Sequence, residues 1–266
     1  MGKKFYECEQ DNSYCYQDSC ILKNKLGIRN KEQLEEAERN ITALRILQLK
    51  TGELRGEPNF KYLCKIHKHI FGDIYSWAGK IRTVDISKGN MFCNSQFILE
   101  NAEDIFNRLK KENYLQDYKD VNKMSERLAY YLSEINALHP FREGNGRAQR
   151  EFARLVCFEC GYDFNLSCAT HKEMLEASKL SFNIGDSSAF VKIFSKAISP
   201  HCEDVWNEPD VLSILTSDDL IIGTASDYDY YGYNEHENAE AYDNIYKEKI
   251  SKMDAEEILS DKIKFT

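Results

Sequence analysis

The chain has 266 residues, of which 42% are hydrophobic and 30% are charged, a composition typical of a globular protein. Its formal net charge of −9 is concentrated at one end, because residues 201–266 hold 17 acidic residues and 5 lysines, which leaves residues 1–200 with about +3. A nearly neutral body without a dense basic patch argues against nucleic-acid binding, and no apolar run is long enough to predict a membrane span.

The nine cysteines are interpreted as thiols. Their number is odd, and the first residues lack the apolar core of a signal peptide, which predicts a cytoplasmic location, with secretion into a host cell as the alternative. Cys157-x-x-Cys160 and Cys168-x-x-His171 have the spacing of zinc knuckles. Because Cys157 and Cys160 continue a predicted helix and only a short segment separates the two pairs, we favour buried thiols.

Three parts are expected along the chain: an N-terminal arm over residues 1–20, a helical domain over residues 21–200, and an acidic, tyrosine-rich extension over residues 201–266. The arm is polar and aromatic without a period. Helical spacing of apolar residues predicts helices over residues 31–49, 61–71, 96–110 and 122–138, with Leu34, Ala37, Ile41, Leu44 and Leu47 on the buried face of the first. His67 and His69 face different ways on their helix and are interpreted as structural or surface residues.

Residues 82–97 contain the only clear strand pattern. Thr83–Ile86 alternates, residues 87–90 predict a turn, and Met91–Cys93 predicts a returning strand. Two strands are only marginally stable by themselves, so we expect a hairpin packed on helices and not a larger sheet. The predicted fold class is therefore all-α with a single β-hairpin.

Residues 139–150 concentrate the chemistry of the chain. Pro140 ends the preceding helix, and helical spacing returns from Arg147 to about Cys160, where Gly161 is a C-cap. The start of a helix offers backbone N–H groups and a partial positive charge to a phosphate, and glycines allow close approach. The sequence of this segment is His139-Pro140-Phe141-Arg142-Glu143-Gly144-Asn145-Gly146-Arg147-Ala148-Gln149-Arg150.

Four side chains of this segment have a predicted role. Arg147 and Arg150, one helical turn apart, offer forked donors for phosphate oxygens. Glu143 is interpreted as a ligand of Mg²⁺, and His139 as a general base for an attacking hydroxyl. Together these groups predict phosphoryl or nucleotidyl transfer. The alternative is a polar loop between two helices, with a packed histidine and solvated arginines.

This segment resembles the signature of the Fic family (filamentation induced by cAMP), His-Pro-Phe-x-[Asp/Glu]-Gly-Asn-Gly-Arg-x-x-Arg, without a departure. A second run, Phe71-x-x-x-Tyr75-x-Trp77-Ala78-Gly79-x-x-Arg82, is also similar to Fic proteins. The resemblance implies a Fic-type helical domain whose hairpin is a flap over the active site. It implies a protein adenylyltransferase, a nucleotidyltransferase that transfers AMP from ATP to a Tyr, Ser or Thr hydroxyl of a target protein and releases pyrophosphate.

The same resemblance implies roles for individual residues. His139 would be the catalytic base and Glu143 the Mg²⁺ ligand. The ATP-binding residues would be Gly144, Asn145, Gly146, Arg147 and Arg150 of the motif, with Ser87 and Lys88 of the flap. Phe92 of the flap would dock the target. Thr170 is predicted to cap a helix over residues 171–183, on which Met174, Leu175 and Ser178 occupy positions that often line the adenine side in the family. A last helix is expected over residues 187–198.

The chain departs from many Fic proteins in lacking a full inhibitory pattern, [Ser/Thr]-x-x-x-Glu-[Gly/Asn], whose glutamate pairs with the second motif arginine. Two near misses occur: Ser199 with Glu203, followed by an aspartate, and Tyr233 with Glu237, where tyrosine replaces the small hydroxyl. We therefore predict a toxin-like chain that is active without truncation and is held by a separate small, antitoxin-like inhibitory protein.

Two other functions stay open. A kinase similar to the Doc toxins would transfer the γ-phosphate, but those proteins replace motif glycines, and Gly144 and Gly146 are both present. A non-catalytic interaction module would act through residues 201–266, which are interpreted as a solvated tail or as a docking or self-modification segment.

Overall fold

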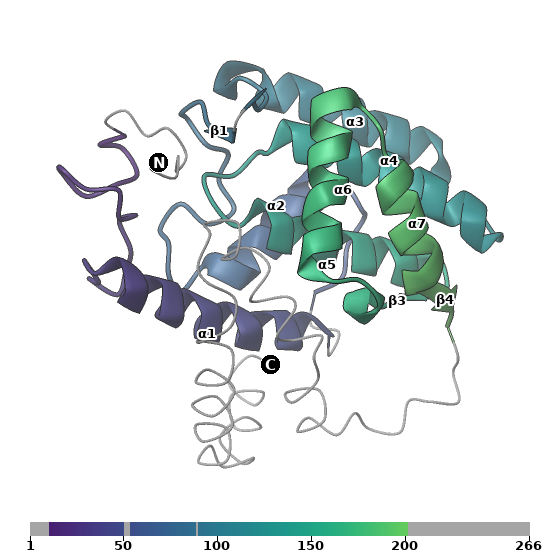
Figure 1. Cartoon of the computed structure of the whole chain (residues 1–266), viewed down its shortest axis with the longest axis horizontal. Coiled ribbons are helices and arrows are strands. Elements are labelled where there is room, and N and C mark those ends of the chain that lie inside the picture. The colour runs from purple at the N-terminus through teal and green to yellow at the C-terminus, as the bar shows by residue number, and fades with distance from the viewer. Residues whose placement is uncertain (1–10, 51–53, 89, 202–266) are drawn as a thin grey trace, which may run out of the picture. The chain divides into compact units, whose positions relative to one another are not determined.

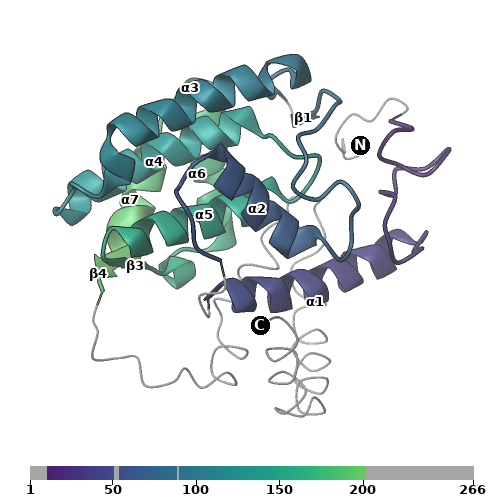
Figure 2. The same cartoon turned by 180° about the vertical axis from the view of Figure 1, so that it is seen from behind.

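The structure is a computed structural model that describes residues 11–50, 54–88 and 90–201. Within these residues the chain forms seven α-helices, and α1, α2 and α5 are stacked below α3 and α4 in both views of the fold (Figures 1 and 2). The predicted helices are confirmed to within a few residues. The helices are α1 Lys31–Lys50, α2 Phe60–Phe71, α3 Ile98–Lys111, α4 Val121–Leu138, α5 Asn145–Glu159, α6 His171–Ile184 and α7 Ser188–Ala197.

Helix α4 is the centre of the packing and contacts α3, α5, α6 and α7. Its start is capped by Asp120, whose carboxylate accepts a hydrogen bond from the backbone amide of Lys123 at 2.9 Å. Its apolar side chains at helical spacing, among them Leu128 and Ile135, are buried as predicted. The helix therefore carries the segment that follows it, residues 139–144, into the interior of the domain.

The buried face of α1 differs from the prediction. Leu34 and Leu47 are buried, but Leu44 is 37% exposed, while the polar residues Glu38 and Thr42 are buried. Burying a carboxylate is unfavourable unless it is paired, so polar positions of a helix are normally predicted to face the solvent. The pairing partner of Glu38 comes from α5, as described below.

The predicted hairpin is present, but its strands are shorter and closer to the tip than expected. Strand β1 (Ser87–Lys88) pairs antiparallel with β2 (Asn90–Met91). The residues below them bond elsewhere: the amide of Thr83 donates to the hydroxyl of Tyr14 at 3.1 Å, and the amide of Cys93 donates to the carbonyl oxygen of Ala137 at 3.1 Å. The stems are thus attached to the N-terminal arm and to α4, and also to each other, because the amide of Phe92 donates to the carbonyl oxygen of Ile86 at 3.2 Å.

A second antiparallel pair was not predicted. Strand β3 (Tyr162–Phe164) follows α5 and pairs with β4 (Ile198–Pro200) after α7. Ser199 therefore lies in a strand, so the first near miss to an inhibitory helix does not begin in a helix. Glu203, the Tyr233 run and nearly all of the predicted extension lie outside the described residues.

The described part of the N-terminal arm packs on the helical body. Cys15 and Leu22 form an isolated antiparallel bridge, and Tyr14 and Cys15 are buried. The ring of Tyr14 meets the ring of Trp77 edge-on, with 5.8 Å between centroids. Asp11 forms an ion pair with Arg142 of the motif at 2.9 Å, so this segment reaches the loop between α4 and α5.

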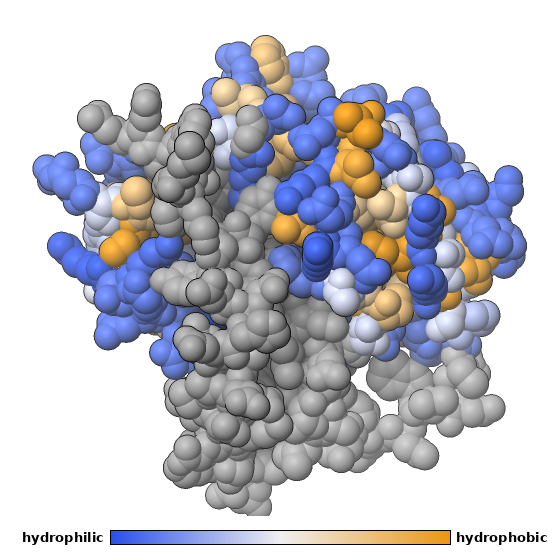
Figure 3. Space-filling view, viewed as in Figure 1, coloured by the Kyte–Doolittle hydropathy of each residue, from blue (hydrophilic) through white to orange (hydrophobic). Residues whose placement is uncertain are grey.

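The described surface is mostly hydrophilic where it is visible in Figure 3, with smaller apolar groups among the charged residues. Large apolar side chains that are exposed include Leu180 and Ile184 of α6 and Met91 of the hairpin. None of the described helices combines the length and apolar composition that a membrane crossing needs.

Candidate active site

His139 occupies the turn that ends α4. Its backbone is left-handed, with φ 44° and ψ 62°, and its amide donates to the carbonyl oxygen of Ile135 at 3.0 Å. The Nδ1 atom of the buried ring lies 3.1 Å from the carbonyl oxygen of Asn136. A carbonyl oxygen only accepts hydrogen bonds, so Nδ1 carries the proton in the neutral ring and Nε2 is the atom that can take one.

The start of α5 is built around Gly144. Its φ is +79°, and a Cβ added there would lie 2.2 Å from Cζ of Phe71, so both the backbone conformation and the close packing require glycine. The side chain of Asn145 closes the loop by accepting from the amide of Phe141 at 2.9 Å and donating to its carbonyl oxygen at 2.8 Å. The first bond inside the helix is donated by the amide of Ala148, so the earlier amide of Gly146 has no acceptor within α5, as at any helix start.

Glu143 is held from behind by a buried histidine. The Nδ1 atom of His67 accepts from the amide of Gly79 at 2.9 Å, so Nε2 carries the proton and donates to the carbonyl oxygen of Glu143 at 2.9 Å. Burial lowers the pKa of His67 to about 3, which keeps this ring neutral. The Oε1 atom of Glu143 accepts from the amide of Gly144 at 3.1 Å. His67 is thus a structural residue, one of the two roles allowed for it from the sequence.

The two motif arginines lie in different surroundings. Arg150 lines the cavity described below. The side chain of Arg147 is 1% exposed and is paired with Glu38 of α1, with 2.6 Å between Nη2 and Oε1. Its Nη1 donates to the hydroxyl of Thr42 at 3.1 Å, and Tyr75 donates to the other carboxylate oxygen of Glu38. Arg147 therefore joins α5 to α1, which is not the position expected of a phosphate ligand.

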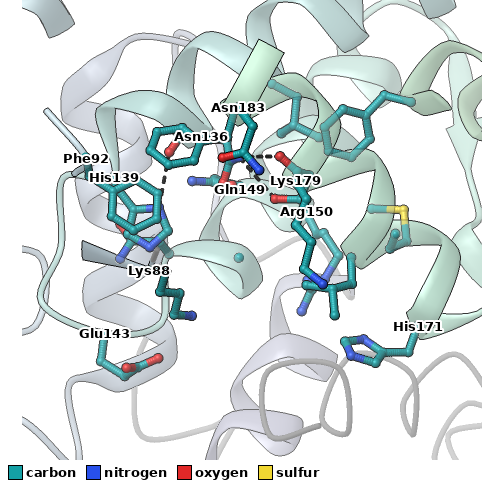
Figure 4. Close-up of a pocket in the computed structure, with 18 residues that line it drawn as sticks. Lys88, Phe92, Asn136, His139, Glu143, Gln149, Arg150, His171, Lys179 and Asn183 are labelled. Atoms are coloured by element: carbon teal, nitrogen blue, oxygen red, sulfur yellow. Dashed lines mark hydrogen bonds between the residues drawn. The ribbon is translucent and has the colours of Figure 1, made fainter. Parts of the chain in front are cut away.

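A cavity of about 220 Å³ opens between the motif, the hairpin and helix α6. Figure 4 shows His139 and Phe92 on one side of it and His171 on the other. Asn136 donates from its side chain to the hydroxyl of Ser178 at 3.0 Å across the cavity wall. Polar lining residues include Lys88, Glu143, Asn145, Gly146 and Arg150, and apolar ones include Leu132, Met174, Leu175, Phe182 and Phe190.

Most residues predicted for the site meet at this cavity, including Met174, Leu175 and Ser178 of α6. Ser87 and Gly144 are not among its lining residues, although Lys88 and Gly146 are. Three residues without a predicted site role contact the motif but do not line the cavity: Glu38, His67 and Arg82. Arg82 belongs to the second run that resembles Fic proteins, which was a signal for its importance, whereas Glu38 gave no signal in the sequence.

Phe92, expected to dock a target, is buried in this structure. Its ring stacks on the ring of His139 with 3.8 Å between centroids and on Phe182 of α6 at 4.6 Å. The side chain of Asn90 donates to that of Asn183 at 2.7 Å, so the hairpin spans the cavity from the motif to α6. The exposed apolar side chain of the hairpin is Met91, at 61%.

The described residues contain no group of three His, Cys, Asp or Glu side chains that could hold a metal ion by themselves. Cys157 and Cys160 are buried, and burial raises the pKa of both thiols, that of Cys160 to about 11. The burial of these two thiols agrees with the interpretation made from the sequence, whereas Cys168 is exposed.

A helix start open to an anion, a buried histidine with one basic nitrogen, and a hairpin over the same cavity define a Fic-type nucleotide site on a helical domain. The model of the Fic/DOC family matches residues 58–157. The probable protein adenylyltransferase Fic of Escherichia coli K12 is 37% identical over 201 residues, which are 75% of this chain and 97% of that protein. The chain belongs to the Fic/DOC family.

One further sequence relative and one solved structure are also similar to this chain. The protein adenylyltransferase VbhT of Bartonella schoenbuchensis is 39% identical over 178 residues, which are 66% of this chain but 37% of VbhT. The chain thus spans little more than a third of that relative. The N-terminal Fic domain of a VirB-translocated Bep effector from Bartonella quintana, solved with bound ADP, superposes with a TM-score of 0.67 at 26% identity, over 71% of this chain and 96% of that one.

Proposed function

We propose that this chain is a protein adenylyltransferase that transfers AMP from ATP to a hydroxyl group of a target protein and releases pyrophosphate. The observation that carries the proposal is the meeting of His139, Glu143, Arg150 and the start of α5 at one cavity. The names of the relatives, protein adenylyltransferases in E. coli and B. schoenbuchensis, support it.

In this reaction Nε2 of His139 takes the proton of the target hydroxyl while its oxygen attacks the α-phosphorus of ATP. The bond from the α-phosphorus to the bridging oxygen breaks, and the electron pair leaves with pyrophosphate. The bond from Nδ1 to the carbonyl oxygen of Asn136 and the stack on Phe92 fix the ring, which limits the loss of entropy in the transition state.

The phosphates of ATP would lie at the start of α5. The amide of Gly146 and the guanidinium of Arg150 offer donors there, and Lys88 brings a second cation from the hairpin. Gly144 and Asn145 shape the loop. The base would lie against the apolar side of the cavity near Met174 and Leu175. Arg147 is assigned to anchoring α5, and a contact of Ser87 with ATP stays a prediction.

A magnesium ion fits the donors that are present. Mg²⁺ in nucleotide sites is held by one or two carboxylates together with phosphate oxygens and water, and Glu143 supplies one carboxylate at the cavity wall. When bound, the ion would supply positive charge to the phosphates. Glu143 would hold it, and His67 fixes the backbone of Glu143 through its carbonyl oxygen.

Labelling with ATP tests the proposal. The chain is incubated with a cell lysate, Mg²⁺ and ATP labelled in the α or the γ position, beside the variant His139→Ala. Adenylylation leaves α label on protein, and the variant should lose it by about 10²- to 10⁴-fold while still binding ATP. Retention of the γ label alone would indicate a Doc-like kinase. Binding of MgATP without any transfer would indicate an interaction module.

We also propose that the chain acts in the cytoplasm and is restrained by a separate small inhibitory protein. The proposal rests on the lack of a full inhibitory pattern in the sequence. The 266-residue chain is compared with a chain that ends at Pro200, in self-modification and in the growth of expressing cells. A large gain of activity on shortening would place inhibition within the chain itself.

A further inference from the structure

Arg82 is the last residue of the second Fic-like run and precedes the hairpin, and its side chain is fully buried. Its guanidinium donates to three backbone carbonyl oxygens. Nε donates to His139 at 2.8 Å, Nη1 donates to Val84 at 2.7 Å, and Nη2 donates to Cys93. The backbone amide of Arg82 donates to the carbonyl oxygen of Pro140 at 2.9 Å. One residue therefore contacts both the motif and the hairpin.

The three acceptors belong to segments that must be aligned for transfer. Val84 precedes β1 and Cys93 follows β2, so both stems of the hairpin bond to the same planar group. The third acceptor is the carbonyl oxygen of His139. A guanidinium holds its donors in a rigid plane, so it fixes the positions of these carbonyl groups relative to one another.

The conformation of His139 makes this contact more important. The residue is left-handed, which is unfavourable for a side chain with a Cβ, and its carbonyl and that of Pro140 both bond to Arg82. On the hairpin side, the amide of Phe92 donates to the carbonyl oxygen of Ile86 at 3.2 Å, and the ring of Phe92 lies on that of His139. The positions of the two hairpin stems therefore determine where the ring of Phe92 stacks on His139, and this stack orients the proposed base.

We propose that Arg82 is a positioning residue that fixes the position of the hairpin relative to the backbone of His139, the proposed catalytic base. The proposal rests on the proposed adenylyl transfer and adds to it a residue that touches neither ATP nor the target. Without the guanidinium, the base and the hairpin would move independently, and transfer would slow. ATP would still bind, because its proposed donors at the start of α5 and on Arg150 lie outside the hairpin, and of the proposed phosphate donors at the cavity wall Lys88 alone would move with it.

Arg82→Lys is the first test, because lysine keeps the charge but cannot reach three carbonyl groups with one rigid fork. We expect kcat for transfer to a target protein to fall at least about tenfold, with a smaller rise in the Kd for ATP. The matched control is Arg154→Lys. Arg154 is also largely buried and donates to the carbonyl oxygen of Leu49 at 3.1 Å, but it does not line the cavity. This control should leave kcat unchanged.

Hydrogen exchange of amides in residues 83–93 gives a readout that does not depend on activity. Arg82→Lys should raise exchange there at least about tenfold, while Arg154→Lys should not. If Arg82→Lys does not fold, Arg82→Met fills the space without burying an unpaired charge and takes its place. An unchanged kcat, or equal losses of kcat and ATP affinity, overturns the proposal. If the wild-type protein transfers no AMP but Arg82→Lys still raises exchange in residues 83–93, the proposed function is refuted. The role of Arg82 in aligning the hairpin with the backbone of His139 then still stands.

Discussion

The buried pair between Glu38 and Arg147 predicts a large and specific loss of stability on replacing Glu38 by Gln. The two side chains are 5% and 1% exposed, with 2.6 Å between the charged atoms. The variant removes the counter-charge that Glu38 supplies to the buried guanidinium, and removing one partner of a buried pair costs about 3–5 kcal/mol. Glutamine retains an acceptor oxygen and Thr42 still accepts from Arg147, so we expect a value near the lower limit.

Glu35→Gln on the same helix is the matched control. Glu35 pairs with Lys31 at 3.6 Å near the surface, where such pairs contribute at most about 1 kcal/mol. The free energy of unfolding is measured for both variants by urea denaturation at pH 7. The double variant Glu38→Gln with Arg147→Met removes both buried charges, so its loss should be smaller than the sum of the single losses by more than about 1 kcal/mol. Additive losses, or equal losses for Glu38→Gln and Glu35→Gln, would refute the reasoning.

Three further predictions follow from the site. Gly144→Ala should destabilise the protein by about 1–3 kcal/mol more than Gly161→Ala in urea denaturation, because both glycines have a left-handed φ but only the first new methyl meets Phe71; equal losses would contradict this. An unfolded histidine titrates near 6.5 and His67 at about 3, so below pH 6.5 only the unfolded chain gains this proton. The free energy of unfolding should then fall by up to about 1.4 kcal/mol per pH unit down to pH 3, and His67→Gln should remove this part of the slope; an unchanged slope would argue against it. Glu143→Ala should lose the Mg²⁺-dependent activity, measured by titrating the ion with fixed ATP, and an unchanged response to Mg²⁺ would exclude Glu143 as the ligand.

Features encoded in neighbouring residues could be predicted from the sequence. The start of α6 is an example, because the side chain of Thr170 accepts from the amide of Glu173, and the side chain of Glu173 bonds back to the amide of Thr170. The pairing of β3 with β4 could not be predicted in this way. It joins Tyr162–Phe164 to Ile198–Pro200, two runs of three residues with two helices between them, and neither run is long enough to show an alternation.

The same limit applies to the pairing of Arg147 with Glu38. The sequence places Arg147 and Arg150 one turn apart at the start of a helix, but helical spacing alone does not show which of them faces a cavity. That depends on Glu38, more than a hundred residues earlier, whose burial contradicts the usual preference of a carboxylate for the surface. A polar residue on an apolar helix face is informative only once its partner is known.

The ion pair between Asp11 and Arg142 has a consequence for moving this domain into other proteins. Both side chains are less than a tenth exposed, and in the sequence Arg142 lies between the proposed catalytic base and the proposed metal ligand. The family model matches residues 58–157. A transfer of these residues alone to another protein would move the motif without the carboxylate of Asp11, which pairs with Arg142. A fusion or chimera in which this loop stays intact should therefore begin no later than Asp11. A graft limited to residues 58–157 would leave Arg142 buried near His139 without the carboxylate of Asp11.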